Sequence, residues 1–151
     1  MKTLTLLDAL ETFCKQTLPT AQIALLNLPK VPASDLVVLM NPVPDEQIIN
    51  GFQSRIITTW DVLYFHSHAA RVVEGTEKLR KAFVHGITIP YMDTDGQMWY
   101  IRVQTFRPSK IFENESDLKY TFSKLETITK GVRNVEQFEM MQEIAFNKEV
   151  R

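Results

Sequence analysis

The sequence predicts an α+β domain in which two helices pack on one face of a mainly antiparallel sheet, followed by an extended or helical C-terminal tail. Three observations lead to this fold class. Residues 5–18 and 69–84 carry apolar side chains at helical spacing. Several segments between and after them have the short, β-branched and alternating character of strands. An Asp95-Gly96 turn joins two of these strands into a hairpin.

Length and composition fit one globular domain. Of the 151 residues, 44% are hydrophobic and 23% are charged, which argues against a disordered chain. Seventeen basic residues balance eighteen acidic ones, and this disfavours a dedicated nucleic-acid-binding protein. No apolar run approaches the ~18 residues that cross a bilayer. We therefore expect neither a membrane partner nor sequence-specific nucleic-acid recognition.

The first helix is expected over residues 5–18. Its apolar stripe includes Leu10 and Cys14, Thr5 can cap its start, and Pro19 ends it. Because Cys14 lies on this stripe, we interpret it as a buried structural residue. It is the only cysteine, which excludes an internal disulfide and a cysteine-based metal cluster.

Prolines punctuate the next part of the chain. Residues 21–28 and 35–40 are predicted as short strands, and the prolines around them place these strands at sheet edges. Asn50-Gly51 predicts a hairpin or a bulge. In the following strand, residues 55–65, the last four residues are apolar on both faces. We expect that end to be covered on both sides, by a helix on one and by protein or a partner on the other.

The second helix is expected over residues 69–84, with Ser67 as a plausible N-cap. Gly75 in its interior costs about 1 kcal/mol relative to alanine. The glycine therefore predicts either a late helix start or close packing at that point. A hairpin of residues 87–92 and 97–106 follows, with Met98 and Tyr100 on its outward-facing side.

The last strand is expected over residues 118–127, and the domain is expected to comprise residues 1–130. Residues 131–151 then form a C-terminal tail or arm. Val135, Phe138 and Met141 have roughly helical spacing, whereas Met141 and Ala145 could share one face of an extended segment. Both conformations of the tail stay open.

His66 and His68 are the two histidines that lie close together in the sequence. Two imidazoles at this spacing on a strand could bind zinc, but a third ligand would have to come from His85 or a distant carboxylate. A polar strand-to-helix junction is the simpler interpretation. The sequence has no glycine-rich phosphate loop and no GxSxG elbow. We therefore expect no enzyme, no cofactor and no metal site.

Exposed methionine and aromatic side chains indicate a binding surface instead. Met98 and Tyr100 occupy the polar face of a strand, and Met140 and Met141 lie in the tail. Adaptable apolar groups at such positions are typical of protein interfaces.

The layout resembles the tail terminator family (tail completion or minor capsid proteins) of long-tailed bacteriophages and phage-tail-like particles. The resemblance covers residues 4–127. It is carried by the opening helix LLDALETFCKQTLP, the short strand DLVVLMNP, the strand and helix TTWDVLYFHSHAARVVEGTEKLRKAF, and the hairpin IPYMDTDGQMWYIRV. The terminal MMQEIAFNKEV is similar to an extended tail of some members.

This resemblance implies a structural subunit that forms a ring, usually a hexamer, on the last ring of the tail tube. Such a ring stops tube growth and joins the tube to the head connector. The implied partners are further copies of the chain, the tail-tube or sheath protein and the head–tail connector. The expected location is the virion or phage-tail-like particle, assembled in the host cytoplasm. The interface is expected at Tyr91, Asp93, Asp95, Met98, Tyr100, Phe138, Met140, Met141 and Phe146.

Two alternatives remain open at this point. The chain could be another head–tail connector or tail-assembly subunit, because nothing in the resemblance is specific to one ring of the particle. It could also be a small metal-dependent or ligand-binding α+β protein that uses His66 and His68.

Overall fold

A computed structural model describes residues 5–51, 53–93 and 96–132. The helices are α1 (Leu6–Thr17) and α2 (Ala69–Ala82). The strands are β1 (Gln22–Leu25), β2 (Leu36–Ile48), β3 (Gln53–His66), β4 (Thr88–Met92), β5 (Met98–Arg107), β6 (Ile111–Glu113) and β7 (Lys119–Val132). The predicted fold class is confirmed.

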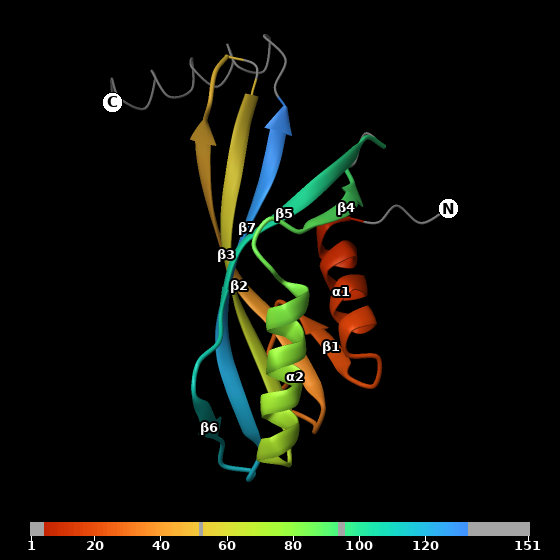
Figure 1. Cartoon of the computed structure of the whole chain (residues 1–151), viewed down its shortest axis with the longest axis vertical. Coiled ribbons are helices and arrows are strands. Elements are labelled where there is room, and N and C mark those ends of the chain that lie inside the picture. The colour runs from red at the N-terminus through yellow and green to blue at the C-terminus, as the bar shows by residue number, and fades with distance from the viewer. Residues whose placement is uncertain (1–4, 52, 94–95, 133–151) are drawn as a thin grey trace.

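The strands form one sheet in the order β1-β2-β3-β7-β5-β4, with β6 paired to β7. All the pairings are antiparallel except the one between β1 and β2. Both helices lie on the same face (Figure 1). Because α1 contacts both β1 and β4, which are opposite edges of the sheet, the sheet must curl around this helix.

The main core lies between the helices and the concave face of the sheet. The helices supply fully buried Leu10, Cys14, Val72 and Leu79, and Phe83, the C-cap of α2, is buried beside them. The strands supply the facing layer of Val37, Leu39, Trp60, Val62, Ile101, Val103 and Leu125. Burying a side chain of this size stabilises the fold by about 1.5–3 kcal/mol relative to leaving it exposed. This core holds the two helices against the sheet.

A second, smaller core lies on the convex face. It contains Leu36, Val38, Leu63, Phe65 and Leu118. The prediction that the end of β3 is covered on both sides is therefore confirmed, with α2 on one side and loops of the chain itself on the other. The segment of residues 26–35, which connects the parallel strands β1 and β2, supplies part of that cover.

The strand β2 is longer than predicted because it continues through two prolines. Asn41 has a positive φ of 54° and forms a bulge, which resets the register between Met40 and Val43. Pro44 then pairs with Thr58 in β3. Strand β1 pairs only with residues 36–39, so beyond them β2 has a neighbour on one side. Pro42 and Pro44 thus sit on an edge, but residues 36–39 lie between β1 and β3, so the predicted edge position is confirmed for β1 and wrong for this part of β2.

In strand β7, the face that is more deeply buried is not the one that carries the aromatic side chains. Thr121, Ser123 and Thr127 lie buried on the helix side, whereas the apolar Tyr120 and Phe122 face the convex side and are only partly buried. The strand also continues to Val132, beyond the predicted end at residue 127. Strand β6 consists of three exposed residues, which is too short to give a strand pattern in the sequence.

Helix α2 begins at the predicted residue, Ala69, but its N-cap lies one residue later than predicted. His68, not Ser67, is the N-cap, and it makes no capping side-chain hydrogen bond. The sequence predicts either a late helix start or close packing at Gly75, and the structure shows close packing. A Cβ at this position would lie 2.7 Å from Cζ of Tyr64. Neither described helix is long and apolar enough to cross a membrane.

Candidate functional site

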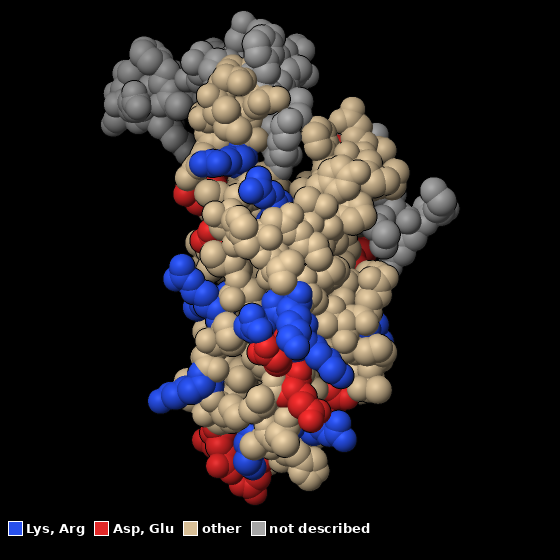
Figure 2. All heavy atoms as spheres, viewed as in Figure 1, with Lys and Arg blue, Asp and Glu red and all other residues tan. Residues whose placement is uncertain are grey.

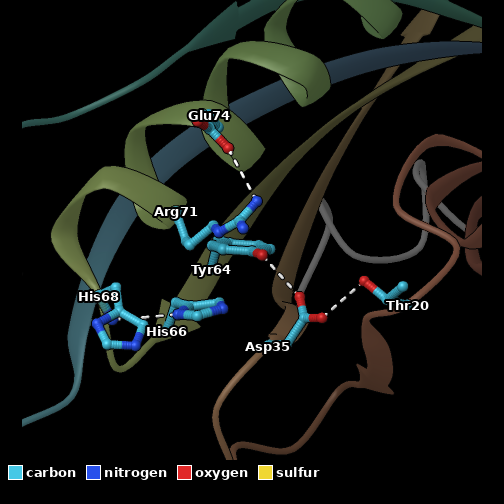
Figure 3. A network of polar contacts seen from close by, with 7 residues as sticks. All are labelled: Thr20, Asp35, Tyr64, His66, His68, Arg71 and Glu74. Carbon is cyan, nitrogen blue, oxygen red and sulfur yellow. Dashed lines mark hydrogen bonds and ion pairs between the residues drawn. The ribbon is translucent and has the colours of Figure 1, made fainter.

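A polar cleft of about 470 Å³ opens where several element ends meet at one end of the sheet. Strands β1 and β2 are parallel, so both begin at the same end of the sheet. Thr20 comes shortly before β1 and therefore lies next to Asp35, which comes directly before β2. The antiparallel β3 ends there as well and contributes Tyr64 and His66. The first turns of α2 form the remaining wall (Figure 3).

Asp35 is the centre of the polar network in this cleft. Its carboxylate accepts hydrogen bonds from Tyr64 Oη at 2.6 Å and from Thr20 Oγ1 at 2.8 Å. Burial acts to raise the pKa of Asp35, but these two hydrogen bonds, with the charges of His66 and Lys15, outweigh it and lower the pKa below its ordinary value. Asp35 is therefore ionised at neutral pH.

The phenol of Tyr64 responds in the opposite direction. Burial, together with the hydrogen bond to the Asp35 carboxylate, raises the pKa of Tyr64 well above its ordinary value. Tyr64 is thus a neutral hydrogen-bond donor across the physiological range. Its ring fills the space beside Gly75 in α2, so the network ties the helix to the start of β2.

Cationic side chains line the α2 side of the cleft. Arg71 pairs with Glu74 at 3.3 Å, one helical turn away, and Lys78 follows on the same wall. On the exposed face of the helix, Arg80 pairs with Glu77. Figure 2 shows acidic and basic side chains interleaved over this face rather than one basic patch.

The structure places His66 and His68 at the mouth of the cleft, with ring centroids 5.7 Å apart. They do not share a strand face, because β3 ends at His66 and His68 caps α2. Nδ1 of His66 accepts a hydrogen bond from the backbone N–H of His68 at 3.1 Å. Within residues 5–51, 53–93 and 96–132, no group of three or more possible ligands is arranged to hold a metal ion.

Cys14 has no access to this cleft or to solvent. The side chain is fully buried on the face of α1 that packs into the main core, and this burial, together with the charge of Glu11, raises the pKa of the thiol to about 12. The thiol therefore stays protonated at neutral pH, and Cys14 acts as a small core residue, as predicted.

The predicted interface residues of the β4–β5 hairpin divide into two groups. Met98 and Tyr100 are 55% and 56% exposed on the face of β5 opposite the buried Ile101. Tyr91 is half-buried and packs against the main core. Asp93 accepts hydrogen bonds from the backbone N–H of Gln97 and from Trp99 Nε1, so it shapes the turn. Asp95 and the predicted tail residues Phe138, Met140, Met141 and Phe146 lie outside the described residues.

Sequence reasoning missed two surfaces. One is the Thr20–Asp35–Tyr64 network, for which the glycine at position 75 was the available signal, since it marks where a large side chain meets α2. The other is an apolar groove of about 440 Å³ on the convex face. Its floor comes from β3 and β7, and its walls are loops that local patterns do not place together.

Comparison with known proteins bears on the fold. No protein-family model matches the sequence, and no curated protein is significantly similar to it. Among solved structures, one similar chain is part of the virion of a native gene transfer agent (GTA) particle. It superposes with a TM-score of 0.51 over 78% of this chain and 84% of that chain, at 10% sequence identity. The chain thus shares its fold with a chain of a gene transfer agent virion.

Proposed function

We propose that this chain is a structural subunit of a phage or phage-like particle, and that it acts as the ring-forming tail terminator. In this role it caps the tail tube and joins it to the head connector. The observation that carries the proposal is the fold shared with a chain of the gene transfer agent virion. The resemblance of residues 4–127 to tail terminators supports the finer assignment. The chain works by contact with other proteins, without catalysis.

Open sheet edges support self-association. Among the described residues, β1 and β4 end the sheet, and the part of β2 beyond Leu39 is paired on one side only. A strand with an unpaired edge can accept a strand from a neighbouring chain. Head-to-tail contacts of this kind close into a ring when the rotation between copies divides a full turn.

Exposed apolar side chains support contact with other subunits. Val43, Ile48 and Ile49 are exposed along the β2–β3 hairpin, and Met98 and Tyr100 are exposed on β5. Clusters of this kind on a soluble domain mark protein-binding surfaces. We assign them to neighbouring copies, to the tail-tube or sheath protein and to the head–tail connector, all within the virion.

Two measurements on the purified chain test the proposal. Native mass spectrometry should give the mass of a closed ring. When the chain is added to growing tail tubes, negative-stain electron microscopy should show it at one tube end, and elongation should stop. A chain that stays strictly monomeric and never caps tubes would contradict the proposal.

The β5 surface gives a matched pair of variants for the same assay. The double substitution Met98→Asp and Tyr100→Asp places two charges on the expected interface and should reduce ring formation by at least tenfold. Val84→Asp adds a charge at a position of similar exposure (48%) beyond α2 and should leave assembly unchanged. Equal effects of both changes would argue against the β5 surface as the interface.

The same experiments separate the alternatives. A position elsewhere in the particle would identify the chain as another connector or tail-assembly subunit. Bound metal in elemental analysis, lost in the His66→Ala and His68→Ala double variant, would favour the metal-dependent protein instead.

A further inference from the structure

The sheet has two halves, and each half has its own pair of edges. In the half that carries α2 the strand order is β1-β2-β3-β7-β6, because β1 pairs with residues 36–39 and β6 pairs with residues 119–121. In the other half the order is β2-β3-β7-β5-β4. Over the described residues, the edges are therefore β1 and β6 in one half (Figure 1) and β2 and β4 in the other.

Proline interrupts both edges of the half without α2. In an antiparallel ladder, residues alternate between directing their backbone groups toward the neighbouring strand and away from it. The hairpin hydrogen bonds donated by the backbone N–H groups of Ile49 and Asp93 fix this alternation in β2 and β4. Pro44 and Pro90 then lie at positions that point away from the sheet. Each edge thus lacks a donor within the strand, which discourages the addition of another strand.

Strand β1 keeps both kinds of backbone group on its free edge. Gln22 and Leu26 donate their backbone N–H groups to β2 and to the residue before it, so Ile23 and Leu25 point theirs away. Within the part of the chain that the structure describes, no hydrogen bond occupies the backbone groups of Ile23 and Leu25. Their side chains pack against the main core, so the strand is held in place while its edge stays open.

Strand β6 has the same arrangement on the opposite edge. The backbone N–H of Asn114 donates to the carbonyl oxygen of Leu118 at 2.9 Å, so Phe112 faces β7. Ile111 and Glu113 direct their backbone groups away from β7, and no described residue hydrogen-bonds to them there. All three side chains of the strand are exposed. The half with α2 therefore has two edges that can each accept a strand.

The directions of these two edges match. Strand β1 is parallel to β2, and the steps to β3, β7 and β6 are each antiparallel, so β1 and β6 run in opposite directions. A second copy placed beside the first in the same orientation, as in a ring, brings its β6 antiparallel to β1. Along the sheet of one chain, four strand spacings of about 4.8 Å separate the two edges, so a chain cannot pair them with each other.

We propose that β1 of one copy pairs with β6 of the next copy, so that the sheet continues from subunit to subunit. Leu25 then lies opposite Ile111 of the next copy, and Ile23 lies opposite Glu113. This register uses every outward-pointing residue of both strands. The pairing rests on the proposed function, because it requires a ring of copies, and it names the two strands that join them. Since the two edges differ, the contact is head-to-tail, as a closed ring needs.

The side chains beside this ladder are complementary. On the convex face the small Ala24 lies opposite the ring of Phe112, which is 36% exposed in the single chain. On the concave face Lys15 of α1 lies at the start of β1, where its Nζ is 2.6 Å from the carbonyl oxygen of Ala21. The incoming Glu113 adds a negative charge beside this lysine. The pairing therefore joins an aromatic ring to a small residue and an acid to a base.

A disulfide between two full-length copies tests the register. Ala24→Cys and Phe112→Cys are made in separate chains, which are mixed and oxidised mildly. Directly opposite residues of this kind have Cβ atoms about 4.5–5.5 Å apart, close to the range that a disulfide spans. The native Cys14 is fully buried and its thiol pKa is raised to about 12, so it does not compete.

The expected product is a covalent dimer that joins residue 24 of one copy to residue 112 of the other, identified by peptide mass spectrometry. A control mixture of Val84→Cys with Phe112→Cys should give at least tenfold less product, because Val84 is 48% exposed but lies on neither edge. A folded mixture that yields no more 24–112 product than the control overturns the proposal.

A proline substitution tests the hydrogen bonds of the same edge. Ile111→Pro removes one outward donor from β6 and leaves the bonds to β7, so it should lower the fraction of rings in native mass spectrometry at least tenfold. Thr88→Pro is the matched control, since it removes an outward donor from β4, an edge that Pro90 already interrupts. It should leave ring formation unchanged. Equal effects in two chains that keep their circular dichroism spectra would refute the pairing, and if Ile111→Pro unfolds, the disulfide experiment decides alone.

The failure of this pairing can be told apart from the failure of the proposed function. Rings that form and cap tubes without the 24–112 disulfide would refute the pairing and leave the proposed function. Copies that form the disulfide but never cap tubes would refute the role as tail terminator and leave the pairing.

Discussion

At the scale of residues, the polar cleft depends on one close contact. Gly75 in α2 approaches the ring of Tyr64, and Tyr64 in turn is fixed by its hydrogen bond to Asp35. The ring is buried and tethered at its hydroxyl, so it cannot move aside easily. Glycine is thus required at position 75 by packing rather than by backbone conformation.

Substitution of Gly75 by alanine tests this contact. Alanine favours a helix by about 1 kcal/mol over glycine, but the added methyl group overlaps Tyr64 Cζ. Overpacking of this kind costs about 1–3 kcal/mol, so we expect Gly75→Ala to lower the free energy of unfolding by about 1 kcal/mol in urea titrations. Tyr64→Phe releases the ring from Asp35, so the double variant should lose less than the two single losses together. Strict additivity would contradict the tethered ring.

The Tyr64–Asp35 hydrogen bond also predicts a dependence on pH. The pKa of Asp35 is lower in the folded chain than its ordinary 3.8, so its contribution is present above pH 4 and lost as the pH falls below that value. The pKa of Tyr64 is raised above its ordinary 10.0, so its contribution is present below pH 10 and lost above it. Both contributions are complete between about pH 5 and 9.

We therefore expect Tyr64→Phe to lower the free energy of unfolding by about 1 kcal/mol between pH 5 and 9. The difference from the wild type should shrink as the pH falls below 4, because protonated Asp35 accepts a weaker hydrogen bond. Urea titrations at several pH values measure it. Tyr100→Phe is the matched control. Because Tyr100 is exposed, this change should have no effect on the free energy of unfolding at any pH. A difference that stays constant down to pH 3 would argue against this pairing.

At the scale of elements, α2 and β7 meet through a buried pair of threonines. Thr76 Oγ1 and Thr121 Oγ1 are 2.7 Å apart, and both side chains are buried. Strand β7 therefore presents hydroxyl groups to the helix, while its aromatic residues face the convex groove. The pairing satisfies polar groups that would otherwise be costly to bury.

A double-mutant cycle tests this pair. Thr76→Val or Thr121→Val alone leaves the other hydroxyl buried without its partner, which costs about 1–3 kcal/mol. The double variant replaces both hydroxyls with methyl groups of similar shape and should be nearly as stable as the wild type. Thermal unfolding of the four proteins gives the coupling energy, and independent effects of the two changes would disprove it.

At the scale of the whole molecule, the sheet separates a helix-covered face from a convex face with open surfaces. The expected division into a domain of residues 1–130 and a tail of residues 131–151 remains a proposal, and β7 continues to Val132. The buried residues of both described cores come from positions 9–125. The fold and the assembly surfaces are therefore expected to respond separately to changes in the tail.

Truncation after Val132 tests this separation. The shortened chain should keep its circular dichroism spectrum and its cooperative unfolding, because both cores lie within residues 9–125. Its assembly should weaken, since the segment around Phe138 is removed. Size-exclusion chromatography with light scattering measures the change in mass. Unfolding of the truncated chain would show that the tail belongs to the fold.

The sequence by itself determined the two helices, the β4–β5 hairpin and the burial of Cys14. Each depends on local spacing or on a turn residue, which acts over a few positions. Only the tertiary structure decided that β7 buries its threonines, and that Thr20, Asp35 and Tyr64 meet in one cleft. Those outcomes depend on which strands become neighbours in the sheet. That choice is made by packing between segments far apart in the chain, which no local pattern contains.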